Sequence, residues 1–228
     1  MTAAPPPRRA RRALDINAIV RTLKRAVRAW TPPAVAQVQA DRPDPFRALA
    51  SCLLSLRTKD AVTEAASRRL FALADTPAAI LALPRRVIER TIYPVCFYRV
   101  KARTLQEVSR DLLTRFGGRV PDTLDELLTL KGVGRKTANL VVTVGYNKAG
   151  ICVDTHVHRI SNRWGYVRTK TPEATEEALR AALPRRHWIS FNDLLVPFGQ
   201  NCCKPISPLC SQCPVEAYCA KVGVTHHR

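Results

Sequence analysis

Capping residues and prolines divide this sequence into a succession of short helices. Asp15 precedes a segment whose apolar residues recur on one helical face, and Pro32 with Pro33 ends that segment. Thr76–Pro77 and Thr171–Pro172 each place a capping hydroxyl before a proline at the first helical position. No segment has the period-two alternation of a half-buried strand. We therefore predict an all-α fold, with helices at 16–30, 46–56, 60–74, 77–83, 85–92, 100–116, 123–130, 135–144, 171–183 and 188–198.

The chain carries a large excess of positive charge. Its 37 lysines and arginines oppose 18 acidic residues, which gives a net charge of +19 and an isoelectric point near 10.4. Because such an excess repels itself in a compact fold, a polyanionic partner is expected. Nucleic acid is the first choice, and an anionic membrane surface or an ordinary basic protein are the alternatives. No apolar run reaches the roughly 20 residues that a membrane span needs, so no membrane partner is predicted.

The first thirteen residues differ in composition from the rest of the chain. Residues 1–13 hold four arginines, three consecutive prolines and no acid, which predicts a disordered basic arm. They lack the apolar stretch of a signal peptide, so we expect a reducing, cytoplasmic compartment. Heavy use of Ala, Arg and Pro is typical of a GC-rich bacterial genome.

The eight cysteines fall into two groups. Three are scattered through apolar contexts as small core residues, namely Cys52, Cys96 and Cys152. The other five lie within 202–219, and clustered cysteines in an intracellular chain indicate a metal site.

Four of the clustered cysteines have a spacing that suits metal ligands. Cys203, Cys210, Cys213 and Cys219 are separated by six, two and five residues. Four thiolates so close together could bind zinc or an iron–sulfur cluster. Zinc ribbons more often use two short pairs divided by a longer stretch, which favours iron–sulfur. Cys202 is a spare that could replace Cys203 as a ligand, and four unrelated free cysteines are the alternative to any site.

A glycine-rich turn stands between two expected helices, in the sequence LKGVGRKTA at 130–138. Gly132 and Gly134 flank Val133, and glycine permits both a positive φ and a close approach to the backbone. The N–H groups at the start of the following helix can bind an anion, and in this basic chain a DNA phosphate is the expected one. We predict a helix-hairpin-helix that binds the DNA backbone. A simple helix–helix turn is the alternative.

A lysine and an aspartate follow this turn. Lys136 lies at the start of the second helix, and Asp154 lies among apolar neighbours in VDTH. An amine nucleophile with a nearby carboxylate can displace a base from a sugar, with the carboxylate taking the proton and stabilising positive charge on the sugar. A surface lysine and a helix-capping aspartate are the alternative.

Three motifs together, LKGVGRKTAN, VDTHVHRISNR and C-x6-C-x2-C-x5-C, resemble the endonuclease III family over residues 46–219. The resemblance implies a helix-hairpin-helix glycosylase fold, with two helical domains flanking a DNA-binding cleft. Residues 38–148 would form a six-helix barrel domain containing the hairpin. Residues 14–37 with 149–228 would form the iron–sulfur cluster domain.

The resemblance also implies the chemistry. The expected activity is base-excision-repair DNA N-glycosylase with AP lyase activity, acting on oxidised or ring-saturated pyrimidines and on abasic sites in double-stranded DNA. Lys136 would be the nucleophile and Asp154 the catalytic carboxylate. A [4Fe–4S] cluster would be held by the four spaced cysteines and would stiffen a basic loop that includes Lys204 against the DNA backbone. A monomer is expected.

Two positions depart from the family pattern. In LLSLRTKD, at 53–60, Arg57 stands where a glutamine is usual, and that glutamine is implied to fill the hole left by the flipped base. Phe97 stands where a leucine wedge is usual. Both are expected to contact DNA, with altered substrate preference. They also support an alternative, a DNA-binding or damage-sensing protein with weak or no catalysis. A monofunctional mismatch or adenine glycosylase is a further alternative, which Lys136 disfavours.

Overall fold

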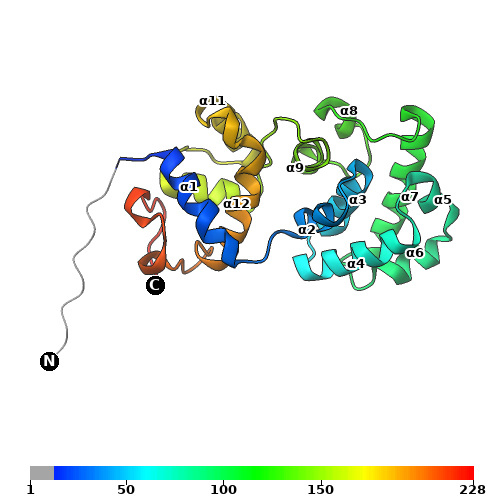
Figure 1. Cartoon of the computed structure of the whole chain (residues 1–228), viewed down its shortest axis with the longest axis horizontal. Helices are drawn as coiled ribbons and strands as arrows, with labels where there is room; N and C mark the ends of the chain where they lie inside the picture. The colour runs from blue at the N-terminus through cyan, green and yellow to red at the C-terminus, as the bar shows by residue number, and fades with distance from the viewer. Residues whose placement is uncertain (1–12) are drawn as a thin grey trace. The chain divides into compact units, whose positions relative to one another are not determined.

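The computed structural model describes residues 13–228, and the regular structure in that range is entirely helical, with no strand (Figure 1). The predicted all-α fold class is confirmed. The predicted basic arm, 1–13, lies outside the described residues except for Ala13. None of the helices described is long and apolar enough to cross a membrane.

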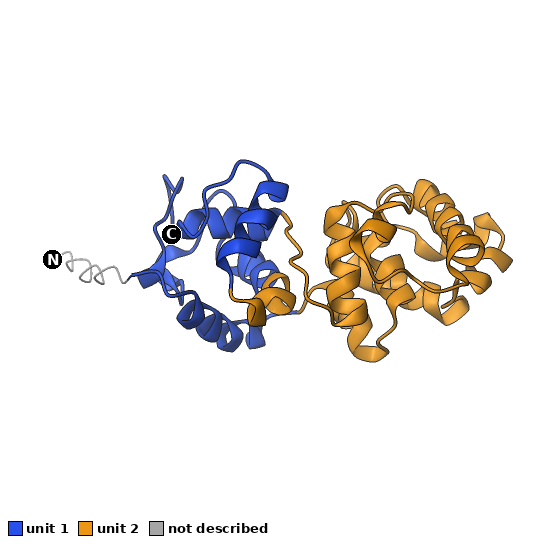
Figure 2. Cartoon of the chain, turned by 90° about the horizontal axis from the view of Figure 1, so that it is seen from above, with its two compact units in different colours: residues 1–31, 155–183, 194–228 blue, residues 32–154, 184–193 orange. Residues whose placement is uncertain are grey.

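The chain folds into two compact units (Figure 2). Of the described residues, the first holds 13–31 with 155–183 and 194–228, and the second holds 32–154 with 184–193. The boundaries between the units therefore fall after residues 31 and 154, whereas the sequence suggested domain boundaries after residues 37 and 148. The short segment 184–193 belongs to the second unit.

The second unit contains most of the helices. They are α2 (Ala34–Asp41), α3 (Pro45–Ser55), α4 (Asp60–Leu73), α5 (Pro77–Ala82), α6 (Arg85–Ile92), α7 (Tyr98–Phe116), α8 (Leu124–Leu128) and α9 (Arg135–Leu140), which continues as a π-helical segment, η2 (Val141–Gly145). The first unit contains α1 (Ile16–Ala26), α10 (Thr155–Trp164) and α11 (Pro172–Ala182), and α12 (Trp188–Asn201) contributes residues to both.

Helix α3 is the centre of the second unit. The Asp44 side chain accepts a hydrogen bond from the Arg47 N–H, and Pro45 occupies the first turn, so the helix start is locally encoded. Every residue from Ala48 to Leu54 is buried. Helices α2, α4, α7 and α9 all pack against it. Burial of each large apolar side chain contributes about 1.5–3 kcal/mol, so the buried residues of α3 stabilise this unit substantially.

Two helices were not predicted from the sequence, α2 and α10. The proline pair before α2 was interpreted only as the end of a helix, yet Pro33 is also the N-cap of the next one. Helix α10 buries Val157, Ile160 and Trp164, at helical spacing, but its many polar residues obscured that pattern. In the first unit the Trp164 and Phe198 rings lie 6.3 Å apart and form an aromatic part of the core.

Candidate active site

The glycine-rich turn joins α8 to α9 as a tight hairpin. Gly132 has a φ of +76°, a conformation that strains any residue with a Cβ, and a Cβ at this position would make a tight contact 3.2 Å from the Thr104 Cγ2 atom. The Val133 side chain is buried and its N–H donates to the Leu130 carbonyl, 3.1 Å away, so Val133 stabilises the turn. Gly134 is the N-cap of α9, and a Cβ there would meet no atom within 4 Å. The backbone at Gly134 is therefore open to a ligand.

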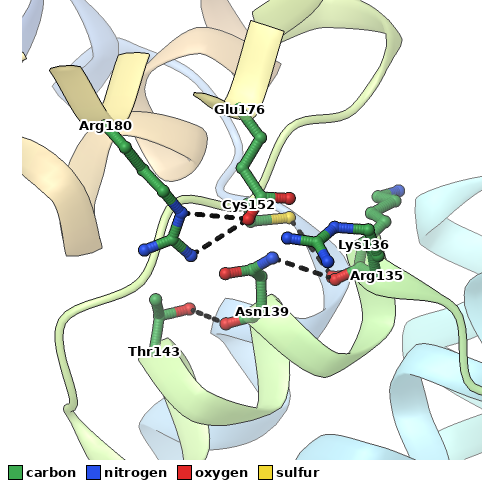
Figure 3. Close-up of polar contacts among 7 residues, drawn as sticks. All are labelled: Arg135, Lys136, Asn139, Thr143, Cys152, Glu176 and Arg180. Atoms are coloured by element: carbon green, nitrogen blue, oxygen red, sulfur yellow. Dashed lines mark hydrogen bonds and ion pairs between the residues drawn. The ribbon is translucent and has the colours of Figure 1, made fainter. Parts of the chain in front are cut away.

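Lys136 lies in the first turn of α9 and is exposed. The three residues after it, Thr137 to Asn139, are buried, so the helix that carries the lysine is fixed in the core. Asn139 Nδ2 donates to the Arg135 carbonyl at 3.1 Å, and Thr143 Oγ1 donates to the Asn139 carbonyl at 2.9 Å. Figure 3 shows the Lys136 side chain extending away from these contacts.

Asp154 belongs to the same unit as Lys136 and ends a buried segment. Ile151, Cys152 and Val153 are buried, and Asp154 itself is half-buried at the start of α10. Cys152 is a common neighbour of both candidate catalytic residues. Burial raises the pKa of the Cys152 thiol well above its usual value, the Lys136 charge lowers it, and the Asp154 charge raises it further. The structure therefore brings both charged groups within electrostatic reach of one buried sulfur.

The two wedge candidates, Arg57 and Phe97, lie against each other. The Arg57 guanidinium carbon is 5.2 Å from the centroid of the Phe97 ring, a cation–π contact. Both residues are exposed, and both have left-handed backbones, with φ of 56° and 57°. An open groove between α6 and the start of α7 is lined by aromatic and charged side chains, Arg86, Glu89, Arg90, Tyr93, Tyr98 and Arg99.

The clustered cysteines lie in the first unit and line one cavity. Its wall is formed by all five, Cys202, Cys203, Cys210, Cys213 and Cys219, together with apolar side chains such as those of Trp164 and Phe198. Within residues 13–228 no three potential ligands stand at metal-binding geometry. Even so, the donor set fits a cysteine-ligated group, because the thiols converge on one largely apolar cavity.

Arg163 holds the loop that begins this cysteine segment. Its Nη1 donates to the Lys204 carbonyl at 2.6 Å and to Cys203 Sγ at 3.5 Å, and its Nη2 donates to the Pro205 carbonyl. Lys204 is half-buried in that loop.

Comparison with known proteins identifies the family. A profile described as the HhH-GPD superfamily of base excision DNA repair proteins matches residues 50–185. The chain is 50% identical to Endonuclease III of Thermotoga maritima over 176 residues, which is 77% of this chain and 83% of that protein. The chain belongs to the endonuclease III family. The resemblance inferred from the three motifs is thereby confirmed.

Solved structures of endonuclease III with DNA share this fold. A non-covalent endonuclease III–DNA complex matches with a TM-score of 0.76 and 32% identity, over 91% of this chain and 96% of that one. A trapped endonuclease III–DNA covalent intermediate, an estranged-adenine complex, matches with a TM-score of 0.75 and 33% identity, over 91% and 97%.

Two residues that contact the candidate site residues or their loops were missed by sequence analysis. Cys152 was interpreted only as a core residue, although its backbone carbonyl accepts from Asn192 Nδ2 at 3.3 Å and its thiol contacts the Lys136 backbone. The position of Cys152 two residues before Asp154 was the available signal. Lys101, whose Nζ donates to the Leu54 and Leu56 carbonyls shortly before Arg57, had no signal that distinguished it from other lysines.

Proposed function

We propose that this protein is a bifunctional DNA N-glycosylase and AP lyase that removes oxidised or ring-saturated pyrimidines from double-stranded DNA. The observation that carries the proposal is the exposed amine of Lys136 on a helix fixed in the core, in the same unit as Asp154. A relative has been trapped in a covalent bond to DNA, as an amine nucleophile requires.

The first half of the reaction releases the damaged base. The damaged nucleotide leaves the base stack so that its sugar is accessible. The neutral Lys136 amine forms a bond to C1′ while the bond from C1′ to the base nitrogen breaks, and the base leaves with the electron pair and takes up a proton. Asp154 accepts the proton from the amine and stabilises the positive charge that develops on the sugar.

The second half breaks the strand. The bond from C1′ to the ring oxygen O4′ breaks, and O4′ keeps the electron pair and takes up a proton. The nitrogen lone pair forms a protonated imine between Lys136 and C1′, which makes the C2′ proton acidic. Loss of that proton and cleavage of the C3′–O bond expel the phosphate on the 3′ side, and water then hydrolyses the imine to regenerate the amine. The lysine thus links base release to strand cleavage.

DNA is held chiefly through its backbone. The turn from Gly132 to Gly134 and the basic loop with Lys204 contact phosphates, and the net charge of +19 supplies the long-range attraction. Arg57 and Phe97 face the gap that the extruded base leaves, where an arginine offers base-edge donors and an aromatic ring stacks. The protein acts as a monomer on chromosomal DNA in a bacterial cytoplasm.

The four spaced cysteines, Cys203, Cys210, Cys213 and Cys219, hold a [4Fe–4S] cluster, and Cys202 is a neighbour that is not a ligand. When bound, the cluster ties residues 203–219 into one rigid loop, and no step of the reaction runs through it. The convergence of the thiols on one cavity and the Arg163 contacts to that loop support this assignment.

The proposal is tested with duplexes that contain thymine glycol or a pre-formed abasic site, scored separately for base release and strand cleavage. The wild-type protein should perform both, and borohydride added during the reaction should leave it covalently bound to DNA. Lys136→Gln should lose trapping and both activities but retain DNA binding. Lys148→Gln, at an exposed lysine paired with Asp122 in the same unit, is the matched control. Efficient base release by Lys136→Gln would show that water attacks the sugar and would establish the monofunctional alternative.

A further inference from the structure

Lys101 is a buried lysine whose hydrogen-bond partners are uncharged oxygens. It lies in the first turn of α7 with 7% of its surface exposed. Its Nζ donates to the Leu54 carbonyl at 2.7 Å, the Leu56 carbonyl at 2.6 Å and Thr58 Oγ1 at 3.1 Å. These acceptors match the three N–H donors of an ammonium group. A buried ammonium is costly without such bonds, so the site is built around the charge.

The oxygens that bind Lys101 lie on both sides of Arg57. Leu54 is in the last turn of α3, Leu56 is the C-cap of that helix, and Thr58 follows Arg57. A cation at the end of a helix satisfies carbonyls that have no partner within the helix. Arg57 itself has a φ of 56°, which is unfavourable for a residue with a Cβ and persists only where its neighbours are fixed. The side chain of Lys101 fixes both of those neighbours.

The same residue also holds Phe97. The Lys101 backbone N–H donates to the Phe97 carbonyl at 3.0 Å, which is the first helical bond of α7. Thr58 Oγ1, already bound to Lys101 Nζ, accepts a second hydrogen bond from the Cys96 N–H at 3.2 Å. Phe97 has the left-handed φ of 57° as the N-cap of α7. The two left-handed residues are therefore joined through one lysine and one threonine.

We propose that Lys101 is a positioning residue that fixes Arg57 and Phe97 as a single rigid pair, so that base release depends on a lysine that does not itself contact DNA. This rests on the proposed function, in which the pair faces the gap left by the extruded base. The guanidinium stacked 5.2 Å from the ring is the arrangement that Lys101 maintains. Without the lysine side chain, the residues on both sides of Arg57 lose the hydrogen bonds that fix them, and Thr58 holds the backbone before Phe97 less firmly. The two side chains then no longer enter the DNA together.

The test is a double-mutant cycle on the cluster-loaded protein, with single-turnover base release from thymine glycol opposite each of the four bases. Lys101→Met keeps the apolar stem and removes the three hydrogen bonds. It should slow base release by about tenfold or more, and the rates measured opposite the four bases should become more similar to one another. Each rate is divided by the fraction of protein that borohydride traps on DNA. Arg57→Ala should then cost little in the Lys101→Met background. Lys148→Met, the same change at an exposed position of this unit, should match wild type.

Thr58→Ala is a second, milder variant, because it removes only the hydroxyl shared by Lys101 Nζ and the Cys96 N–H. It should change opposite-base preference in the same direction as Lys101→Met and by less. Additive effects of Lys101→Met and Arg57→Ala, or equal slowing opposite all four bases, would overturn the inference while leaving the activity intact. Absence of base release by the wild-type protein would instead overturn the proposed function.

Discussion

The Cys152 thiol donates a hydrogen bond to the backbone carbonyl of Lys136, with 3.6 Å between sulfur and oxygen (Figure 3). This contact joins the first turn of α9 to the buried segment that ends at Asp154. On the other side of Cys152, Asn192 Nδ2 binds its carbonyl oxygen. The positions of the two candidate catalytic residues are therefore linked through Cys152, which bonds to the Lys136 backbone and lies two residues before Asp154.

Two substitutions of Cys152 should distinguish the effect of its hydrogen bond from the effect of its side-chain volume. Cys152→Ala removes the donor and leaves a small cavity, so we expect slower base release and a free energy of unfolding lower by about 1–2 kcal/mol. Cys152→Ser keeps a donor toward the Lys136 carbonyl and should retain more activity than Cys152→Ala. Denaturant unfolding and single-turnover rates measure both effects. Equal activity of the two variants would show that the hydrogen bond does not position the lysine.

Asp154→Asn should affect the two halves of the reaction unequally. The amide keeps the shape of the side chain and loses its charge, so base release from a thymine glycol duplex should fall strongly. Cleavage at a pre-formed abasic site should fall less, because no base has to be expelled there. DNA binding, measured by fluorescence anisotropy, should persist. Equal losses on both substrates would contradict a role confined to base expulsion.

The cysteine segment should bind iron through four particular residues. The purified protein should be straw-brown with a broad absorbance near roughly 400 nm, as expected for a cysteine-ligated cluster. Cys203→Ser should lose iron and colour, whereas Cys202→Ser should keep both. Metal analysis that finds zinc and no iron would contradict the cluster, and the reverse pattern in the two variants would make Cys202 the ligand.

Arg57→Gln should restore the residue that is usual in the family. A single base-edge contact is worth about 1.4 kcal/mol, so we expect opposite-base preference to change by up to about tenfold. Base release opposite each of the four bases, in separate duplexes, measures this preference. A uniform response to all four opposite bases would identify Arg57 as a phosphate-binding or packing residue.

Lys101 should give the protein a measurable dependence of stability on pH. Burial lowers the pKa of Lys101 from 10.5 to about 8, and the neighbouring Cys96 thiol opposes this effect by raising the pKa. Between these two values the unfolded chain binds more protons than the folded one, so stability contributed by this group rises with pH and is lowest below about pH 8. The free energy of unfolding of wild type, minus that of Lys101→Met, should therefore increase across that window.

Because the charge of Cys96 raises the pKa of Lys101, the comparison is repeated in a Cys96→Ala background. Chemical denaturation at a series of pH values gives the free energies of unfolding for the two pairs. The difference in free energy of unfolding between the proteins with and without Lys101 should still increase with pH when the Cys96 thiol is absent. A difference that stays flat or falls between about pH 8 and about pH 10.5 would show that the buried amine does not titrate there.

Local patterns along the chain were enough to predict much of this protein. The caps at Asp15, Thr76 and Thr171 each begin a helix as expected, because a capping side chain acts on N–H groups two or three residues away. The tight turn at Gly132 follows from backbone conformation alone. The family motifs were likewise visible without coordinates, since each consists of chemically distinctive residues close together in sequence.

Contacts between distant segments were decided only by the tertiary structure. Arg57 and Phe97 are forty positions apart and belong to different motifs, and only the packing of α3 against α7 brings the guanidinium over the ring. Lys101 looks in sequence like any other of the 37 basic residues. Lys101 differs from a typical basic residue because it is buried against the carbonyl oxygens at the end of another helix. Burial depends on the whole fold, because elements far apart in sequence must exclude water together.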